Sequence, residues 1–313
     1  AVASAAARPY FLLQARAGLF HDAPMQWSLS KLALSVLLLV SAGCVSSGPG
    51  VSLREVLQHE IGAERRDLPD VRVTMGAHRG ASMEFRENTL DAILAADRDP
   101  RFAFIEFDVQ YTRDGVIVVY HDLMLVRLFG KVRSVGNETL ASLRDLTGGE
   151  IATYADVMDR VTKRLNIEIK SQGDDREDAR LADALIADLR ARHRLGDTMI
   201  SSISGEVIAY IKRTYPEVKT GQIFWLTSST YLHLDILTEQ LFDRFAETRA
   251  DYLMLHVANL RNIANLLALK PPDKTIVFWD FDDRMYLVHQ DPGDRLWGTP
   301  PPSRGLRALR SGR

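Results

Sequence analysis

Short apolar runs alternate with longer amphipathic segments along most of this chain. Seven of the apolar runs have the length and composition of strands, at residues 71–77, 102–110, 164–170, 198–203, 219–225, 251–256 and 274–279. Helical patterns lie between them, and the clearest spans residues 177–192, where Leu181, Leu185 and Leu189 share one face. This alternation predicts an α/β fold built from βα units around a parallel sheet.

The length of the chain suits one large barrel. About 260 residues follow position 52, which is close to the usual size of a (β/α)8 TIM barrel. An eighth strand is harder to assign, because the run MYLVH after Trp279 is short and the prolines at 300–302 exclude a strand behind it. We therefore expect a TIM barrel over residues 67–290 with an atypical C-terminal strand, and a disordered tail at 291–313.

The residues before the barrel have the pattern of an export signal. Residues 1–24 are rich in alanine and lack a methionine, so we expect an upstream extension before a start at Met25. In residues 25–44, Lys31 supplies positive charge and an apolar run follows at 32–40, too short to span a bilayer as a mature helix. Residues 45–66 are predicted to form a linker and an N-terminal helix.

Cys44 is the only cysteine of the chain. The stretch VSAGC that ends on it resembles the lipobox of bacterial lipoproteins, whose cysteine is acylated, although Ser41 stands where a leucine is usual. The alternative is simple secretion with a free thiol. Either interpretation predicts an exported protein of the cell envelope: a lipoprotein anchored to the membrane, or else a periplasmic or secreted protein.

The overall charge narrows the possible partners. The net charge is −2, and the basic residues are spread along the chain apart from an arginine-rich end. This argues against a nucleic-acid partner.

Two carboxylates lie two residues apart on the strand predicted at 102–110. Because strand side chains alternate between faces, Glu106 and Asp108 point to one face, and Ile105 and Phe107 to the other. Neighbouring acids repel each other unless a cation lies between them, so the pair predicts a divalent-metal site. The alternative is a pair of solvated charges on an edge strand.

The strand predicted at 164–170 repeats this arrangement with Glu168 and Lys170. Glu168 could be the third oxygen ligand of Mg²⁺ or Ca²⁺, and Lys170 could supply a positive charge for an anionic substrate. A buried structural ion pair is the alternative.

Two histidines come at predicted strand ends. His78 is followed by Arg79 after the first strand, and His121 follows the short apolar run VIVVY. Reactive groups of TIM barrels gather at the C-terminal ends of the strands, so we expect His78 and His121 to transfer protons and Arg79 to bind an anion. Asn88 is interpreted as a helix cap, with a supporting role at the site as the alternative.

In this order and spacing the motifs resemble the glycerophosphodiester phosphodiesterase family. The motifs are HRG at 78–80, ENT at 87–89, EFD at 106–108, TRDG with VVYHD within 112–122, and EIK at 168–170. The resemblance implies a TIM barrel that hydrolyses glycerophosphodiesters to an alcohol and glycerol 3-phosphate with one divalent cation, Ca²⁺ or Mg²⁺. It places the catalytic histidines at His78 and His121, the metal ligands at Glu106, Asp108 and Glu168, and the phosphate contacts at Arg79 and Lys170.

The chain departs from this family near its C-terminus. Trp279 is followed by Asp280-Phe281-Asp282, where the family usually has Thr-Val-Asn. Two other functions stay open: a phospholipid-cleaving relative that resembles phospholipase D or phosphatidylinositol phospholipase C, and a non-catalytic binding protein of the cell envelope. The alcohol group, the identity of the cation and the oligomeric state are not determined by the sequence.

Overall fold

The computed structural model describes residues 51–62, 71–226, 235–290 and 296–297, all within one compact unit that spans Ser46–Arg313. The predicted export signal, Cys44 and most of the predicted tail lie outside these residues. In the part of the chain that is described, no helix has both the length and the apolar character needed to cross a membrane.

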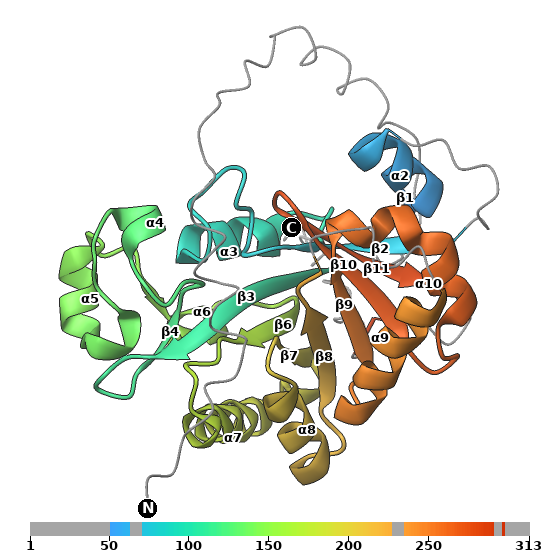
Figure 1. Ribbon diagram of the computed structural model, residues 1–313. Helices are drawn as coiled ribbons and strands as arrows, with labels where there is room; N and C mark the ends of the chain where they lie inside the picture. Colours follow the sequence, from blue (N-terminus) through green and yellow to red (C-terminus); the bar gives the residue numbers. More distant parts are fainter. Residues whose placement is uncertain (1–50, 63–70, 227–234, 291–295, 298–313) are drawn as a thin grey trace, which may run out of the picture. The chain divides into compact units, whose positions relative to one another are not determined.

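A closed barrel of eight strands forms the centre of this unit (Figure 1). Its strands, in chain order, are β2 (Arg72–Ala77), β3 (Phe104–Tyr111), β6 (Arg164–Ile169), β7 (Thr198–Ser202), β8 (Lys219–Phe224), β9 (Tyr252–His256), β10 (Thr275–Phe281) and β11 (Arg284–His289). The spatial order is β2-β11-β10-β9-β8-β7-β6-β3, and pairing of β2 with β3 closes the ring. All seven strands predicted from the apolar runs are present.

The eighth strand is β11, which contains the short run MYLVH. It is antiparallel to both of its neighbours: Tyr286 pairs with Phe278 of β10 and with Met75 of β2. β11 is therefore the return strand of a hairpin that begins with β10, so a turn replaces the usual helical crossover. The prediction of an atypical last strand is confirmed, and the short run is long enough for a strand because it pairs on both sides.

Helices lie outside the barrel strands (Figure 1). The longer ones are α2 (Leu53–Ile61), α3 (Leu90–Arg98), α7 (Asp175–Ala191), α8 (Gly205–Thr214), α9 (Asp235–Thr248) and α10 (Ile263–Leu269). Asp174 caps α7 by accepting hydrogen bonds from the backbone amides of its first turn. The predicted apolar face of this helix is buried, with Leu185 and Leu189 fully inaccessible, and it packs in one core with Ile105 and Phe107 of β3.

The segment between β3 and β6 extends the sheet beyond the barrel. It contains β4 (Ile117–Val119), which is antiparallel to β3, then β5 (Ala152–Thr153), with α4 (Val126–Phe129), α5 (Leu140–Leu146) and α6 (Tyr154–Met158). The remaining short elements are β1 (Val51–Ser52) and the 3-10 helices η3 (Val135–Asn137), η4 (Leu195–Asp197) and η6 (Val257–Asn262). Because His121 directly follows β4 and Tyr120, the extension determines where this histidine lies.

Aromatic side chains fill the barrel at the end where its parallel strands begin. The Phe104 ring lies so close to β2 that a Cβ atom on Gly76 would come 2.1 Å from it, which explains the glycine there. The ring of Trp297 packs edge-on against Phe104 and Tyr252, and its Nε1 donates to the carbonyl oxygen of Asp197. Trp297 is buried although it falls in the segment expected to be a disordered tail, because its indole covers this end of the barrel.

Candidate active site

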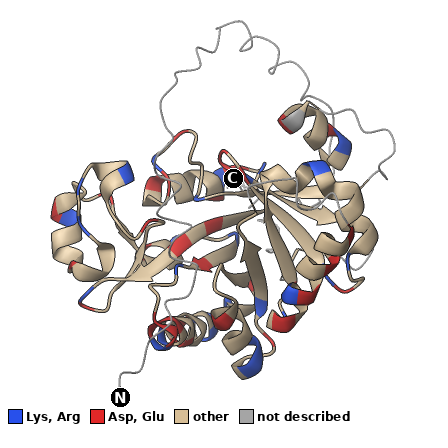
Figure 2. Cartoon of the chain, viewed as in Figure 1, with Lys and Arg blue, Asp and Glu red and all other residues tan. Residues whose placement is uncertain are grey.

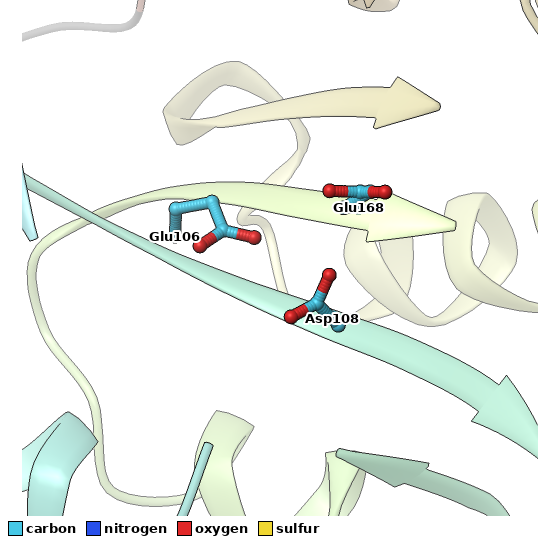
Figure 3. Close-up of side chains that lie close together, drawn as sticks. All are labelled: Glu106, Asp108 and Glu168. Atoms are coloured by element: carbon cyan, nitrogen blue, oxygen red, sulfur yellow. The ribbon is translucent and has the colours of Figure 1, made fainter. Parts of the chain in front are cut away.

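Three carboxylates meet inside the barrel, towards the end where its parallel strands finish. Glu106 and Asp108 lie on β3, and Glu168 lies on β6 directly beside Asp108 in the strand register. One oxygen from each lies within 4.8 Å of the others, and Figure 3 shows the three side chains turned towards a common space. Glu106 and Asp108 are buried, as the alternation along β3 predicts. The structure therefore brings together the three predicted metal ligands and excludes solvated edge-strand charges.

The chemistry of this cluster suits a hard divalent cation. Buried acceptor atoms Glu106 Oε1 and Asp108 Oδ1 have no hydrogen-bond partner among the described residues. Burial and the charges of Asp108 and Glu168 raise the pKa of Glu106 well above its usual value. Burial also raises the pKa of Glu168. Three carboxylates that repel each other, two of them with a buried oxygen that lacks a hydrogen-bond partner, fit Ca²⁺ or Mg²⁺, which prefer oxygen ligands.

Arg79 and Lys170 border the acids as predicted, and both already form ion pairs. Lys170 Nζ donates to Glu168 at 2.7 Å and lies 3.7 Å from Asp108. The ion pair between Glu168 and Lys170 that the sequence offered as an alternative is therefore also present. The backbone amide of Arg79 donates to Glu106 at 2.8 Å, and its guanidinium lies 3.6 Å from Asp108. Arg79 and Lys170 therefore place positive charge beside the acids, and this charge is suited to bind an anionic group.

The charges around the cluster act most strongly on Asp108. Burial alone would raise the pKa of this carboxyl group. The charges of His121, Lys170 and Arg79 outweigh that effect and lower the pKa of Asp108 below its usual range. Asp108 is therefore ionised. Figure 2 shows acidic positions, in red, along β3.

Asn88 supports the site and does not cap a helix. Thr89 is the N-cap of α3, and its hydroxyl accepts from the amide of Ala92. Asn88 is buried with a left-handed backbone (φ 58°). Its side-chain amide donates to Asp108 Oδ2 at 2.7 Å, and its carbonyl oxygen accepts from the Asp108 backbone amide at 3.2 Å. The capping interpretation is therefore wrong, because the left-handed turn directs this side chain into the barrel.

His78 is held by the turn between β10 and β11. Its backbone amide donates to the carbonyl oxygen of Asp283 at 2.9 Å, and its Nδ1 lies 3.3 Å from the carbonyl oxygen of Asp282. A carbonyl oxygen only accepts, so Nδ1 carries the proton and Nε2, 4.0 Å from Glu106, has a lone pair. Burial and the charge of Arg79 lower the pKa of His78 to about 4, so the ring is a neutral proton acceptor at pH 7.

His121 is oriented by a network that the sequence did not reveal. Its Nδ1 donates to Asp122 Oδ1 at 2.6 Å, and its Nε2 has no hydrogen bond to another described residue. Arg127 holds Asp122 through Nε at 2.7 Å, and it also donates to both carboxylate oxygens of Glu87, at 2.6 and 2.9 Å. Glu87 in turn accepts from Arg79 at 2.9 Å. Arg127 has no sequence signal of its own, because only the fold brings α4 against the β2–α3 loop.

Comparison with known proteins agrees with this geometry. The model of the glycerophosphoryl diester phosphodiesterase family matches residues 78–263. A glycerophosphodiester phosphodiesterase of Bacillus subtilis is 28% identical over 220 residues, which is 62% of this chain and 73% of that protein. A human lysophospholipase D is 45% identical over 69 residues, but the match covers only 22% of this chain and 21% of the human protein.

Solved structures share the fold. The glycerophosphodiester phosphodiesterase of Thermotoga maritima has 25% identity and a TM-score of 0.50, covering 66% of this chain and 85% of that one. A phosphodiesterase of Oleispira antarctica, solved in complex with the product sn-glycerol-3-phosphate, has 21% identity and a TM-score of 0.53 over 66% of this chain and 83% of that one. At 21% identity, the similarity to the Oleispira structure shows a shared fold and nothing more.

Proposed function

This chain is an enzyme of the glycerophosphoryl diester phosphodiesterase family, and we propose that it hydrolyses glycerophosphodiesters to an alcohol and glycerol 3-phosphate. The observation that carries this proposal is the buried cluster of Glu106, Asp108 and Glu168, with His78 beside Glu106 and with Arg79 and Lys170 at its edge. The Oleispira structure, which holds sn-glycerol-3-phosphate as a product, supports this choice of product for a related barrel.

We propose that the three carboxylates hold one divalent cation, Ca²⁺ or Mg²⁺. When bound, the cation would neutralise charge on the phosphoryl oxygens. Asn88 fixes the Asp108 carboxylate through its hydrogen bond, so this ligand is held in place before the cation arrives. Arg79 and Lys170 would add positive charge for the phosphate group.

The two histidines are proposed as the proton carriers. Breaking a phosphodiester requires that the attacking oxygen lose a proton and that the leaving alkoxide gain one. His78 offers an unprotonated Nε2 held in place through its Nδ1, and His121 offers Nε2 while Asp122 orients its ring. The attacking oxygen is either water or the neighbouring glycerol hydroxyl, which would give a cyclic phosphate first.

The proposal is tested by measuring glycerol 3-phosphate released from glycerophosphocholine, glycerophosphoethanolamine and a lysophospholipid. We expect release from the water-soluble diesters. The local match to a human lysophospholipase D makes lysophospholipid cleavage the second candidate. Faster cleavage of the lysophospholipid would favour that candidate. Binding without turnover of any of the three would favour the non-catalytic alternative and contradict our proposal.

We also propose that the protein is exported and anchored by a lipid on Cys44, which lies outside the described residues. Cys44→Ser is expected to move the protein from the membrane fraction to the soluble fraction of cells, because serine cannot form the thioether to a lipid. The measurement is fractionation followed by immunoblotting, with Ser46→Ala as the control that should stay with the membranes. A soluble protein with Cys44 intact would show that the signal is only secretory.

A further inference from the structure

Aromatic rings line the barrel rim next to His78. Trp225 follows β8, His256 ends β9 and Trp279 lies on β10, paired with His256 in the strand register. The ring of Trp279 lies 5.1 Å from that of Trp225, 5.2 Å from that of His256 and 6.1 Å from that of His78, measured between centroids. The rings therefore form a continuous wall that leads to one of the proposed proton carriers.

The wall runs from solvent to the interior. Trp225 is 54% exposed, which is unusual for the largest apolar side chain, whereas Trp279 is 5% exposed. The cation–π pairs among the described residues use phenylalanine and tyrosine rings. Neither of these two indoles therefore has a lysine or arginine over its face in the described part of the chain. The buried Nε1 donor of Trp279 also has no hydrogen-bond partner within the described ranges. Trp225 therefore offers an exposed ring to a ligand, and Trp279 backs it from the interior with that unpaired donor.

A carboxylate stands beside this wall because β10 is irregular. The register with β11 shifts between Phe278 and Phe281, and Asp280 has a left-handed backbone (φ 74°), which is costly for a residue other than glycine. In a regular strand Asp280 would face away from Trp279. Here its Oδ2 lies 3.1 Å from Nε2 of His256, whose ring packs edge-on against Trp279.

The direct partner of Asp280 among the described residues is a histidine, His256, while the charge of Arg79 acts on this carboxylate without forming an ion pair. The backbone amide of Ala258 donates to Nδ1 of His256, so the ring carries its proton on Nε2 and donates it to Asp280 as a neutral group. In the described part of the chain no lysine or arginine forms an ion pair with Asp280, and its side chain is 47% exposed. A carboxylate without a lysine or arginine ion-pair partner in the described ranges thus lies beside His256, whose ring packs against both indoles.

From these contacts we infer that Trp225, Trp279 and Asp280 form a subsite for the leaving alcohol and select an alcohol that bears an ammonium group. Aromatic faces attract ammonium groups through the ring quadrupole, and a carboxylate beside them adds a direct charge interaction. His256 positions Asp280 and does not itself contact the alcohol. The inference rests on the proposed function, since it names the substrates that this same site prefers.

Substrate selectivity tests the subsite. Asp280→Asn keeps the acceptor for His256 and tolerates the left-handed backbone, and Trp225→Ala removes an exposed ring, so both should fold. We expect each to lower kcat/KM roughly tenfold for glycerophosphocholine and glycerophosphoethanolamine, and to change it less than about twofold for glycerophosphoglycerol. Asp273→Asn is the charge-matched control, because that exposed residue precedes β10 at the opposite end of the strand. Equal effects on all three substrates, or none, would overturn the subsite.

Binding of choline alone separates this inference from the proposed function. Choline should quench tryptophan fluorescence in the wild-type protein and in Asp273→Asn, and much less in Trp225→Ala and Asp280→Asn. If the wild-type enzyme hydrolyses no glycerophosphodiester but shows this quenching pattern, the proposed function fails and the ammonium subsite stands. If diesters are hydrolysed without selectivity and choline does not quench, the subsite fails and the proposed function stands.

Discussion

Replacing either His78 or His121 by alanine is expected to lower turnover by at least roughly 100-fold. A neutral His78 can accept a proton at Nε2, because Nδ1 is held by the carbonyl oxygen of Asp282 and burial lowers the pKa of the ring to about 4. His121 is held in a matching way through Asp122. Because both act in one reaction, the double variant should be little slower than either single variant. Steady-state kinetics over a range of pH is the measurement.

Controls must separate chemistry from folding, since His78 also ties β2 to the β10–β11 turn. His78→Asn retains a side-chain donor for the carbonyl oxygen of Asp282 and should be as inactive as His78→Ala while melting closer to the wild type. His59→Ala removes a histidine whose side chain is 71% exposed and should leave turnover unchanged. Near-normal turnover of His121→Ala across pH would show that His121 is only a strand-end residue and that the two-histidine mechanism is wrong.

Removal of divalent cations is expected to abolish activity, and Ca²⁺ or Mg²⁺ should restore it. Glu106, Asp108 and Glu168 each place an oxygen within 4.8 Å of the others, and two buried carboxylate oxygens of this cluster have no hydrogen-bond partner among the described residues. A cation that binds only the folded protein also stabilises it, so chelator should lower the melting temperature. Activity and thermal melting are measured with chelator and after titration with each metal.

A matched pair of variants tests whether the cluster is the metal site. Glu168→Gln removes one charged ligand and should raise the metal concentration needed for half-maximal activity. Glu177→Gln changes a half-exposed glutamate of α7 and should not. Full activity of the wild type in excess chelator would contradict the metal assignment and favour the alternative that resembles phosphatidylinositol phospholipase C.

Local patterns were sufficient where the physical rule itself is local. Alternation along a strand places Glu106 and Asp108 on the inner face and Ile105 and Phe107 under the helices, whatever surrounds them. The positions of seven strands follow from the same kind of pattern, and they put His78 and Glu168 at the reactive end of a barrel. The acids, the histidines and the barrel were therefore predictable before any contact was known.

Contacts between distant segments were not predictable in this way. The closing strand β11 depends on pairing with β2, which lies at the other end of the barrel sequence, and its short apolar run reveals neither that partner nor the antiparallel direction. Asn88 supports Asp108 only because its own turn is left-handed, and Arg127 orients Asp122 only because α4 packs near the loop that carries Glu87. Sequence periodicity determines which way a side chain points from its own backbone, whereas the partner that it meets depends on strand register and loop packing, which only the tertiary structure decides.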